Sequence, residues 1–84
     1  METKQDLLFH RLKHIGVFSS VTVQSIGREV GLTSAERRMR EIVEATRLNL
    51  SDMFRFRRIP LAESKERGLV KPNHRPIAWF EVCE

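Results

Sequence analysis

The sequence predicts an α+β fold in which three helices are followed by a two- or three-stranded antiparallel ribbon. Before residue 50, apolar residues recur at the spacing of an α-helix in three separate segments. After Asn49 the spacing changes to a period of two, which is typical of a strand with one packed face. With 84 residues the chain has room for one hydrophobic core, so we expect a single domain over residues 1–84.

Two amphipathic helices are predicted in the first part of the chain. The first covers residues 4–15 and ends at Gly16, and the second has a serine or threonine cap (Ser20 or Thr22) and ends before Gly31. Gly27, inside the second helix, is expected to mark the close approach of another helix. The dipeptide 17–18 is expected to be a short apolar link. The apolar pattern is carried by Leu8, Leu12, Ile15, Val23, Ile26 and Val30.

The third predicted helix, residues 33–48, has the clearest pattern. Thr33 and Glu36 are spaced as a capping box, in which each side chain satisfies a free backbone N–H of the first turn. Arg37 and Arg38 lie off the apolar stripe, so their side of the helix faces water or a charged partner. The stripe itself, expected to be core, consists of Ala35, Met39, Ile42, Val43 and Thr46.

Two strands are predicted after the helices. Phe54 and Phe56 alternate with arginines, which indicates a strand with one packed and one basic face, and Pro60 ends this strand or confines it to a sheet edge. Residues 77–82 are predicted to form the second strand, in which Trp79 is expected to be partly exposed or to cover a helix. The sequence does not predict how residues 60–76 run between the two strands.

Positive charge is concentrated in residues 53–75. Seven basic and two acidic side chains give this segment +5, whereas the whole chain carries +4 and has a pI near 10.0. Such a segment is either a solvated face or a surface that meets phosphate, and the sequence leaves both open. Arg55 and Arg57 have a further alternative, because charge on an edge strand prevents pairing with other chains.

Several classes of protein are not expected. No apolar run approaches the ~18 residues of a membrane span, and the polar start does not resemble a signal peptide. The single cysteine, Cys83, indicates a reducing compartment, and we expect a cytoplasmic protein. No phosphate loop, nucleophile elbow or His-Glu-x-x-His motif is present, so no enzyme and no cofactor are predicted. His10 and His14 share a helical face, but without a third ligand in register we expect no metal site.

The segment 31–42, Gly-Leu-Thr-Ser-Ala-Glu-Arg-Arg-Met-Arg-Glu-Ile, resembles the turn and second helix of a helix-turn-helix unit. It is similar to those of small winged-helix DNA-binding proteins of phages and prophages, and residues 77–82 resemble the last wing strand of that family. The resemblance covers about residues 5–82. The chain departs from the family at Gly27, where alanine is commoner, and in a linker that is longer than a tight wing. The resemblance implies a three-helix helix-turn-helix core followed by a β wing.

The resemblance also implies a double-stranded DNA partner, with the helix 33–48 in the major groove and the basic wing on phosphates. An α-helix about 10–12 Å across fits that groove, and arginine can read guanine there. Because the net charge is small, pairing as a homodimer on a two-fold-related site is expected. The predicted DNA contacts are Thr33, Ser34, Arg37, Arg38, Glu41, Arg55, Arg57, Lys65, Arg67, Lys71, His74 and Arg75.

A second hypothesis is that the chain binds another protein instead of DNA. Glu36, Glu41 and Glu44 make the third helix a poorer DNA reader than an all-basic helix. The same fold can instead be an interaction module that binds a host replication, transcription or defence protein. Binding of RNA or single strands would require exposed aromatic residues within the basic ribbon, and it is left open but not favoured.

Overall fold

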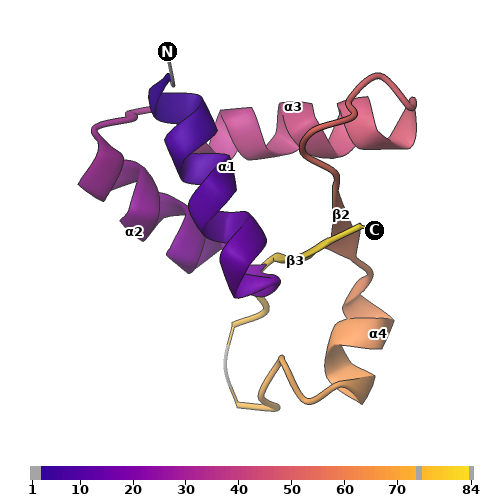
Figure 1. Cartoon of the computed structure of the whole chain (residues 1–84). Coiled ribbons are helices and arrows are strands. Elements are labelled where there is room, and N and C mark those ends of the chain that lie inside the picture. Colours follow the sequence, from indigo (N-terminus) through magenta and orange to yellow (C-terminus); the bar gives the residue numbers. More distant parts are fainter. Residues whose placement is uncertain (1–2, 74, 84) are drawn as a thin grey trace.

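Residues 3–73 and 75–83 are described by the computed structural model, and within these ranges the chain forms four helices and one three-stranded sheet (Figure 1). In chain order the elements are α1 (Lys4–Ile15), β1 (Val17–Ser19), α2 (Ser20–Val30), α3 (Ala35–Arg47), β2 (Phe56–Ile59), α4 (Leu61–Glu66) and β3 (Trp79–Val82). The strand order is β1-β3-β2, with antiparallel pairing. The predicted α+β class is confirmed, although a strand lies between the first two helices and a fourth helix follows β2.

The ends of α1 and α2 are set by capping residues. Thr3 and Asp6 form a capping box at the start of α1, in which the Asp6 N–H donates to the Thr3 hydroxyl at 3.1 Å. Gly16 ends α1 with a φ of 87°, which glycine adopts without steric cost. The predicted bounds of this helix are therefore confirmed. The cap of α2 is Ser19, which precedes both of the predicted caps.

α3 begins at Ala35, two residues later than predicted, and ends one residue earlier. The expected capping box is wrong, because Ser34 is the N-cap and no side chain of a described residue caps α3. The Leu32 N–H donates to the Gly27 carbonyl at 2.8 Å, which keeps Thr33 in the turn between the helices. A Cβ at Gly27 would lie only 2.6 Å from the Ala35 Cβ. The glycine inside α2 thus permits close approach of α3, as expected.

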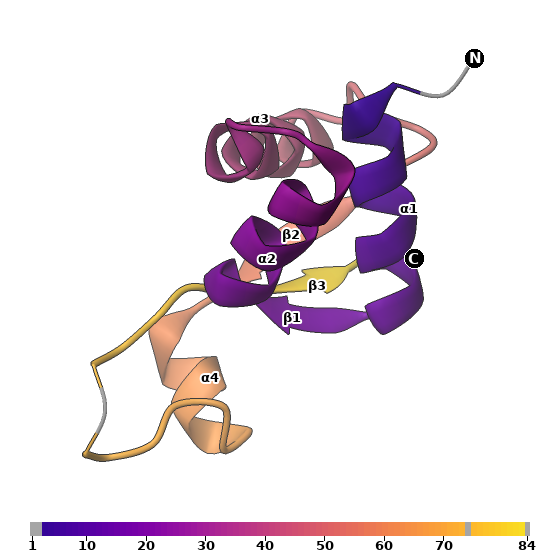
Figure 2. The same cartoon turned by 90° about the vertical axis from the view of Figure 1, so that its left-hand side faces the viewer.

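The hydrophobic core lies between α1–α3 and one face of the sheet (Figure 2). The ring of Phe56 on β2 is at its centre, with its centroid 5.7 Å from those of both Phe9 and Phe18. Three members of the predicted stripe of α3 are buried: Ala35, Met39 and Thr46. The other two, Ile42 and Val43, are only partly buried and pack against the margin of the core.

β1 and β3 differ from the predicted elements. The sequence predicts only a link at residues 17–18, but β1 forms there because Phe18 pairs with Phe80 of β3. β3 begins at Trp79 instead of Ile77. As predicted, Trp79 is partly exposed, whereas Phe80 faces the core and is 7% exposed.

β2 begins at Phe56 instead of Phe54, because its pairing with β3 begins where Phe56 is opposite Val82. Phe54 is buried but precedes the strand. α3 covers the free edge of β2 at one point, where the Phe56 N–H donates to the Thr46 hydroxyl at 3.1 Å. The same hydroxyl donates to the Ile42 carbonyl at 2.7 Å. Thr46 therefore fastens α3 to the sheet.

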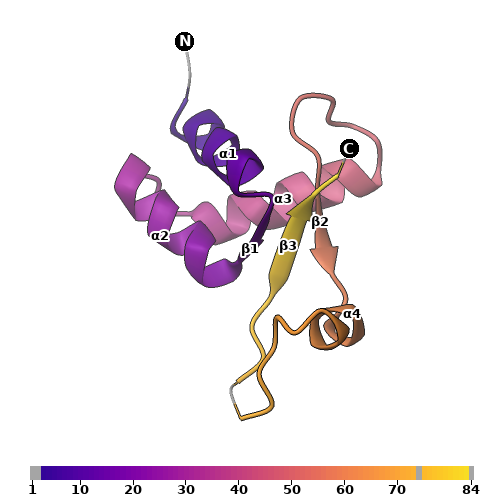
Figure 3. The same cartoon turned by 60° about the horizontal axis from the view of Figure 1, so that its bottom comes forward.

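α4 is an element that the sequence did not predict. Pro60 ends β2, as expected, and its φ of −56° also suits the start of a helix. α4 lies beyond the end of β2 and far from α1 (Figure 3). Between α4 and β3, the described residues form no helix or strand. None of the helices in the described ranges has the length and apolarity needed to cross a bilayer.

Candidate nucleic-acid interface

The predicted base-reading residues other than Arg38 lie in the turn before α3 and on its exposed face. Thr33 is exposed and Ser34 is partly buried, while the side chain of Arg37 is 73% exposed. Arg37 Nε lies 3.4 Å from Glu41 Oε1, and Arg38 Nη1 lies 3.6 Å from Glu41 Oε2. Exposed ion pairs at such distances contribute little, so they leave Arg37 available to a partner.

Arg38 and Arg40 lie on opposite flanks of α3, because residues two apart are separated by about 200° around a helix. Arg40 lines a cavity between α3 and the sheet, so its flank faces β2 and β3. Arg38 is on the other flank, where its Nε is buried and has no hydrogen-bond partner among the described residues. The structure therefore separates Arg38 from the side of α3 that is next to the ribbon.

Two of the predicted phosphate contacts, Arg57 and Arg67, belong to a closed network with Glu63 and Glu81. Arg57 donates to Glu81 Oε1 and to Glu63 Oε2, each at 2.6 Å. Arg67 Nη1 lies 2.9 Å from Glu81 Oε2 and 3.2 Å from Glu63 Oε2. The hydrogen bonds from Arg67 and Arg57 hold the pKa of the Glu81 carboxyl below its usual range. This four-residue network ties α4 to the sheet and occupies both guanidinium groups.

The other predicted phosphate contacts that the structure describes do not share one environment. Arg55 Nη1 donates to Asn49 Oδ1 at 2.9 Å, which holds the loop after α3 in place. His74 lies outside the described residues. Three cations are exposed and make no ion pair with any described residue: Lys65, Lys71 and Arg75. They belong to α4 and to the segment that follows it.

Three arginines that were not selected from the sequence line two adjacent hollows beside α3. Arg28 on α2 and Arg40 on α3 line one surface hollow, and Arg40 and Arg58 on β2 line the adjacent cavity. All three are exposed and make no ion pair within residues 3–73 and 75–83. We call these three residues the arginine track. The sequence shows that each of these residues is basic. It does not show that they lie near one another, because this depends on how α2, α3 and β2 pack.

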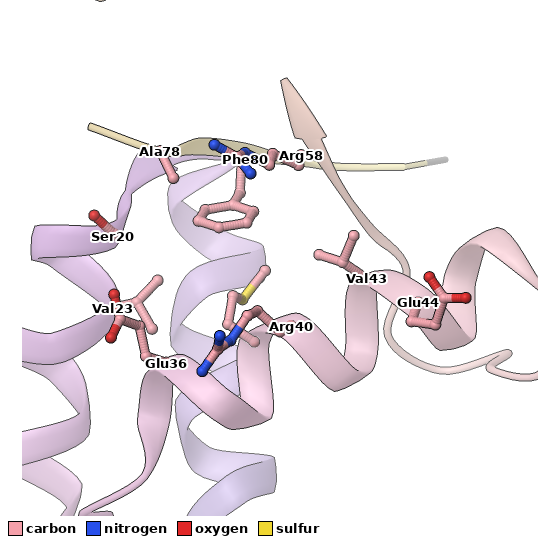
Figure 4. Close-up of a pocket in the computed structure, with 10 residues that line it drawn as sticks. Ser20, Val23, Glu36, Arg40, Val43, Glu44, Arg58, Ala78 and Phe80 are labelled. Carbon is pink, nitrogen blue, oxygen red and sulfur yellow. The ribbon is translucent and has the colours of Figure 1, made fainter. Parts of the chain in front are cut away.

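The cavity beside Arg40 is apolar inside and charged at its rim. It has a volume of about 240 Å³, and Figure 4 shows the ring of Phe80 pointing from β3 towards α3. Glu36 and Glu44 lie on the α3 side of the rim with Arg40, and Arg58 lies on the sheet side. The other lining residues are Ser20, Val23, Met39, Val43 and Ala78.

The site thus combines an exposed helix, unpaired arginines and an apolar cavity, which are features of a binding surface. His10, one of the two histidines considered as metal ligands, packs edge-on against Phe54 at a centroid distance of 4.8 Å. Within the described part of the chain, no three residues of the metal-binding types form a group. Comparison with known protein families, curated proteins and solved structures finds nothing that matches this chain.

Proposed function

We propose that this chain is a winged helix-turn-helix protein that binds double-stranded DNA as a regulator or an architectural protein. The observation that carries the proposal is the arginine track. Arg28, Arg40 and Arg58 come from three different elements, line two adjacent hollows beside α3, and form no ion pair with a described residue, although the carboxylate of Glu36 lines both hollows. A row of unpaired guanidinium groups beside an exposed helix suits a phosphate backbone that runs along that helix.

The proposal assigns different roles to the residues of this surface. α3 enters the major groove, and the exposed Arg37 reads base edges from its first turns. The arginine track binds phosphates on the side of α3 next to the sheet, and Lys71 and Arg75 add further phosphate contacts. With a net charge of +4, one copy binds weakly, so we expect two copies on a two-fold-related site.

The fold supports the winged-helix part of the proposal. The turn between α2 and α3 falls in the segment 31–42 that resembles a helix-turn-helix unit, and an antiparallel pair of strands follows α3. In this proposal, α4 and the segment between it and β3 serve as the wing. The four-residue network gives this larger wing a fixed attachment to the sheet.

Fluorescence anisotropy with a labelled random duplex tests the proposal. Arg40→Ala and Arg58→Ala are each expected to weaken binding to all sequences and to reduce the salt dependence by about one phosphate contact. Arg11→Ala is the matched control, because Arg11 is an exposed arginine on α1 that pairs with Glu29. Equal affinities for the wild type and for both track variants would refute the proposal.

A second candidate function is favoured by the composition of α3. Glu36, Glu41 and Glu44 are exposed on this helix, and an anionic backbone is repelled by each of them. An interaction module that binds a host replication, transcription or defence protein tolerates such a mixed surface. A gel shift with duplex DNA at low salt separates the two candidates, because the module gives no shift at micromolar protein.

A further inference from the structure

The apolar cavity lies on the same side of α3 as the arginine track. Its apolar lining comes from Val23, Met39, Val43, Ala78 and Phe80. Its volume of about 240 Å³ equals several times the ~30 Å³ that one water molecule occupies in the liquid. The cavity therefore has room for several methyl-sized groups. If the proposed function is correct, bound DNA covers the mouth of this cavity.

The charge at the rim favours an anionic partner. Glu44 is already paired with Arg47, whose Nε lies 3.1 Å from Glu44 Oε2. Arg40 and Arg58, on opposite sides of the cavity, have no carboxylate partner among the residues that the structure describes. Of the four charged groups at the rim, two cations and one carboxylate, Glu36, are thus left unpaired.

We infer that this cavity receives the C5-methyl groups of thymines, and this inference rests on the proposed function. The thymine methyl is the one apolar group that base pairs display in the major groove. Val43 is the side chain of α3 that is placed to contact it, because Val43 is partly buried at the margin of the core and lines the cavity. Val43 is then a specificity-determining residue that selects sites rich in thymine.

Replacing thymine by uracil removes this methyl group and changes nothing else in the duplex. The experiment measures binding of the full chain to an alternating adenine–thymine duplex and to the same duplex containing uracil. Wild-type protein is expected to bind the uracil duplex about fourfold more weakly for each buried methyl group. In Val43→Ala and in Val43→Thr, which keeps the shape of the side chain, this preference is expected to disappear.

Val17→Ala is the matched control, because Val17 is another partly buried valine and lines a different hollow. This variant is expected to keep the wild-type preference for thymine. Equal binding of the two duplexes by the wild type would overturn the inference while leaving DNA binding intact, and the cavity would then fit a protein side chain instead. A Val43→Ala variant that still prefers thymine would also overturn it. Failure to bind either duplex would overturn the proposed function as well.

Discussion

Arg57 on β2 and Glu81 on β3 are directly opposite one another in the sheet, and Arg57 Nε donates to Glu81 Oε1 at 2.6 Å. Glu63 and Arg67 of α4 complete the four-residue network. Its two positive and two negative charges cancel. The segment 53–75, which is strongly basic in sequence, therefore offers less charge to a partner than its composition indicates.

The network makes the attachment of α4 sensitive to acid. The pKa values of Glu63 and Glu81 lie below the ordinary 4.5, since both carboxylates accept hydrogen bonds from Arg57 and Arg67. Groups with lowered folded-state pKa values stabilise the fold above the unfolded-state value, and this contribution is lost as the pH falls through the folded-state pKa. The melting temperature is expected to fall as the pH is lowered from about 6 to about 3.

Variants of α4 and β3 identify the carboxylates responsible for this fall. Glu81→Gln is expected to lower the melting temperature near neutral pH and to flatten its dependence on pH. Glu66→Gln should keep the wild-type profile, because Glu66 is an exposed α4 residue without an ion pair in the described ranges. Identical profiles for Glu81→Gln and the wild type would contradict this account.

The contact between α2 and α3 leaves no room for a side chain at position 27. Gly27→Ala improves helix propensity by about 1 kcal/mol, but its Cβ would lie 2.6 Å from the Ala35 Cβ. Overpacking of this kind costs about 1–3 kcal/mol, so we expect net destabilisation in urea unfolding. Ala35→Gly in the same chain should recover part of the loss. A Gly27→Ala protein as stable as the wild type would show that α2 and α3 separate easily.

The hydroxyl of Thr46 supports both α3 and β2. Thr46→Val keeps the shape of the side chain but leaves the Phe56 N–H without its acceptor. An unsatisfied buried donor costs about 1–3 kcal/mol, which chemical denaturation can measure. The amide of Phe56 should also exchange with solvent faster. Thr33→Val, at an exposed position, is the control and is expected to have no effect.

The proposed roles of α3 and the wing can be separated by competition binding. Arg37→Ala is expected to reduce discrimination between a selected duplex and random DNA by about 1–3 kcal/mol, because a base contact is lost. Lys71→Ala should weaken binding to both duplexes equally and lower the salt dependence. If Arg37→Ala weakens both duplexes equally, this residue contacts phosphate and does not read bases.

Much of the fold could be predicted because local signals agree with the packing. The capping box of Thr3 and Asp6, the stop at Gly16 and the apolar spacing between them define α1 without help from the rest of the chain. α3 was different. Thr33 and Glu36 have the spacing of a capping box, but the Leu32 N–H bonds to the Gly27 carbonyl of α2, Thr33 stays in the turn, and Ser34 is the N-cap of α3. Tertiary packing overrides the local signal at that point.

The candidate site was harder to predict from the sequence. Arg57 and Arg58 are adjacent, yet β-strand alternation directs one to the network and the other to the cavity beside α3. α4 was missed because its six residues are too few for a periodic pattern. The partners of Arg57 and Arg67 come from α4 and β3, so their neutralisation appears only once these elements are placed together.

The salt dependence of DNA binding tests the central claim most directly. The logarithm of the association constant is expected to fall linearly with the logarithm of the salt concentration. Replacing Arg28, Arg40 and Arg58 together by alanine should make this slope shallower by about 2.7, which corresponds to three lost phosphate contacts. A slope unchanged by this triple substitution, or wild-type binding indifferent to salt, would contradict a phosphate-binding role for the arginine track.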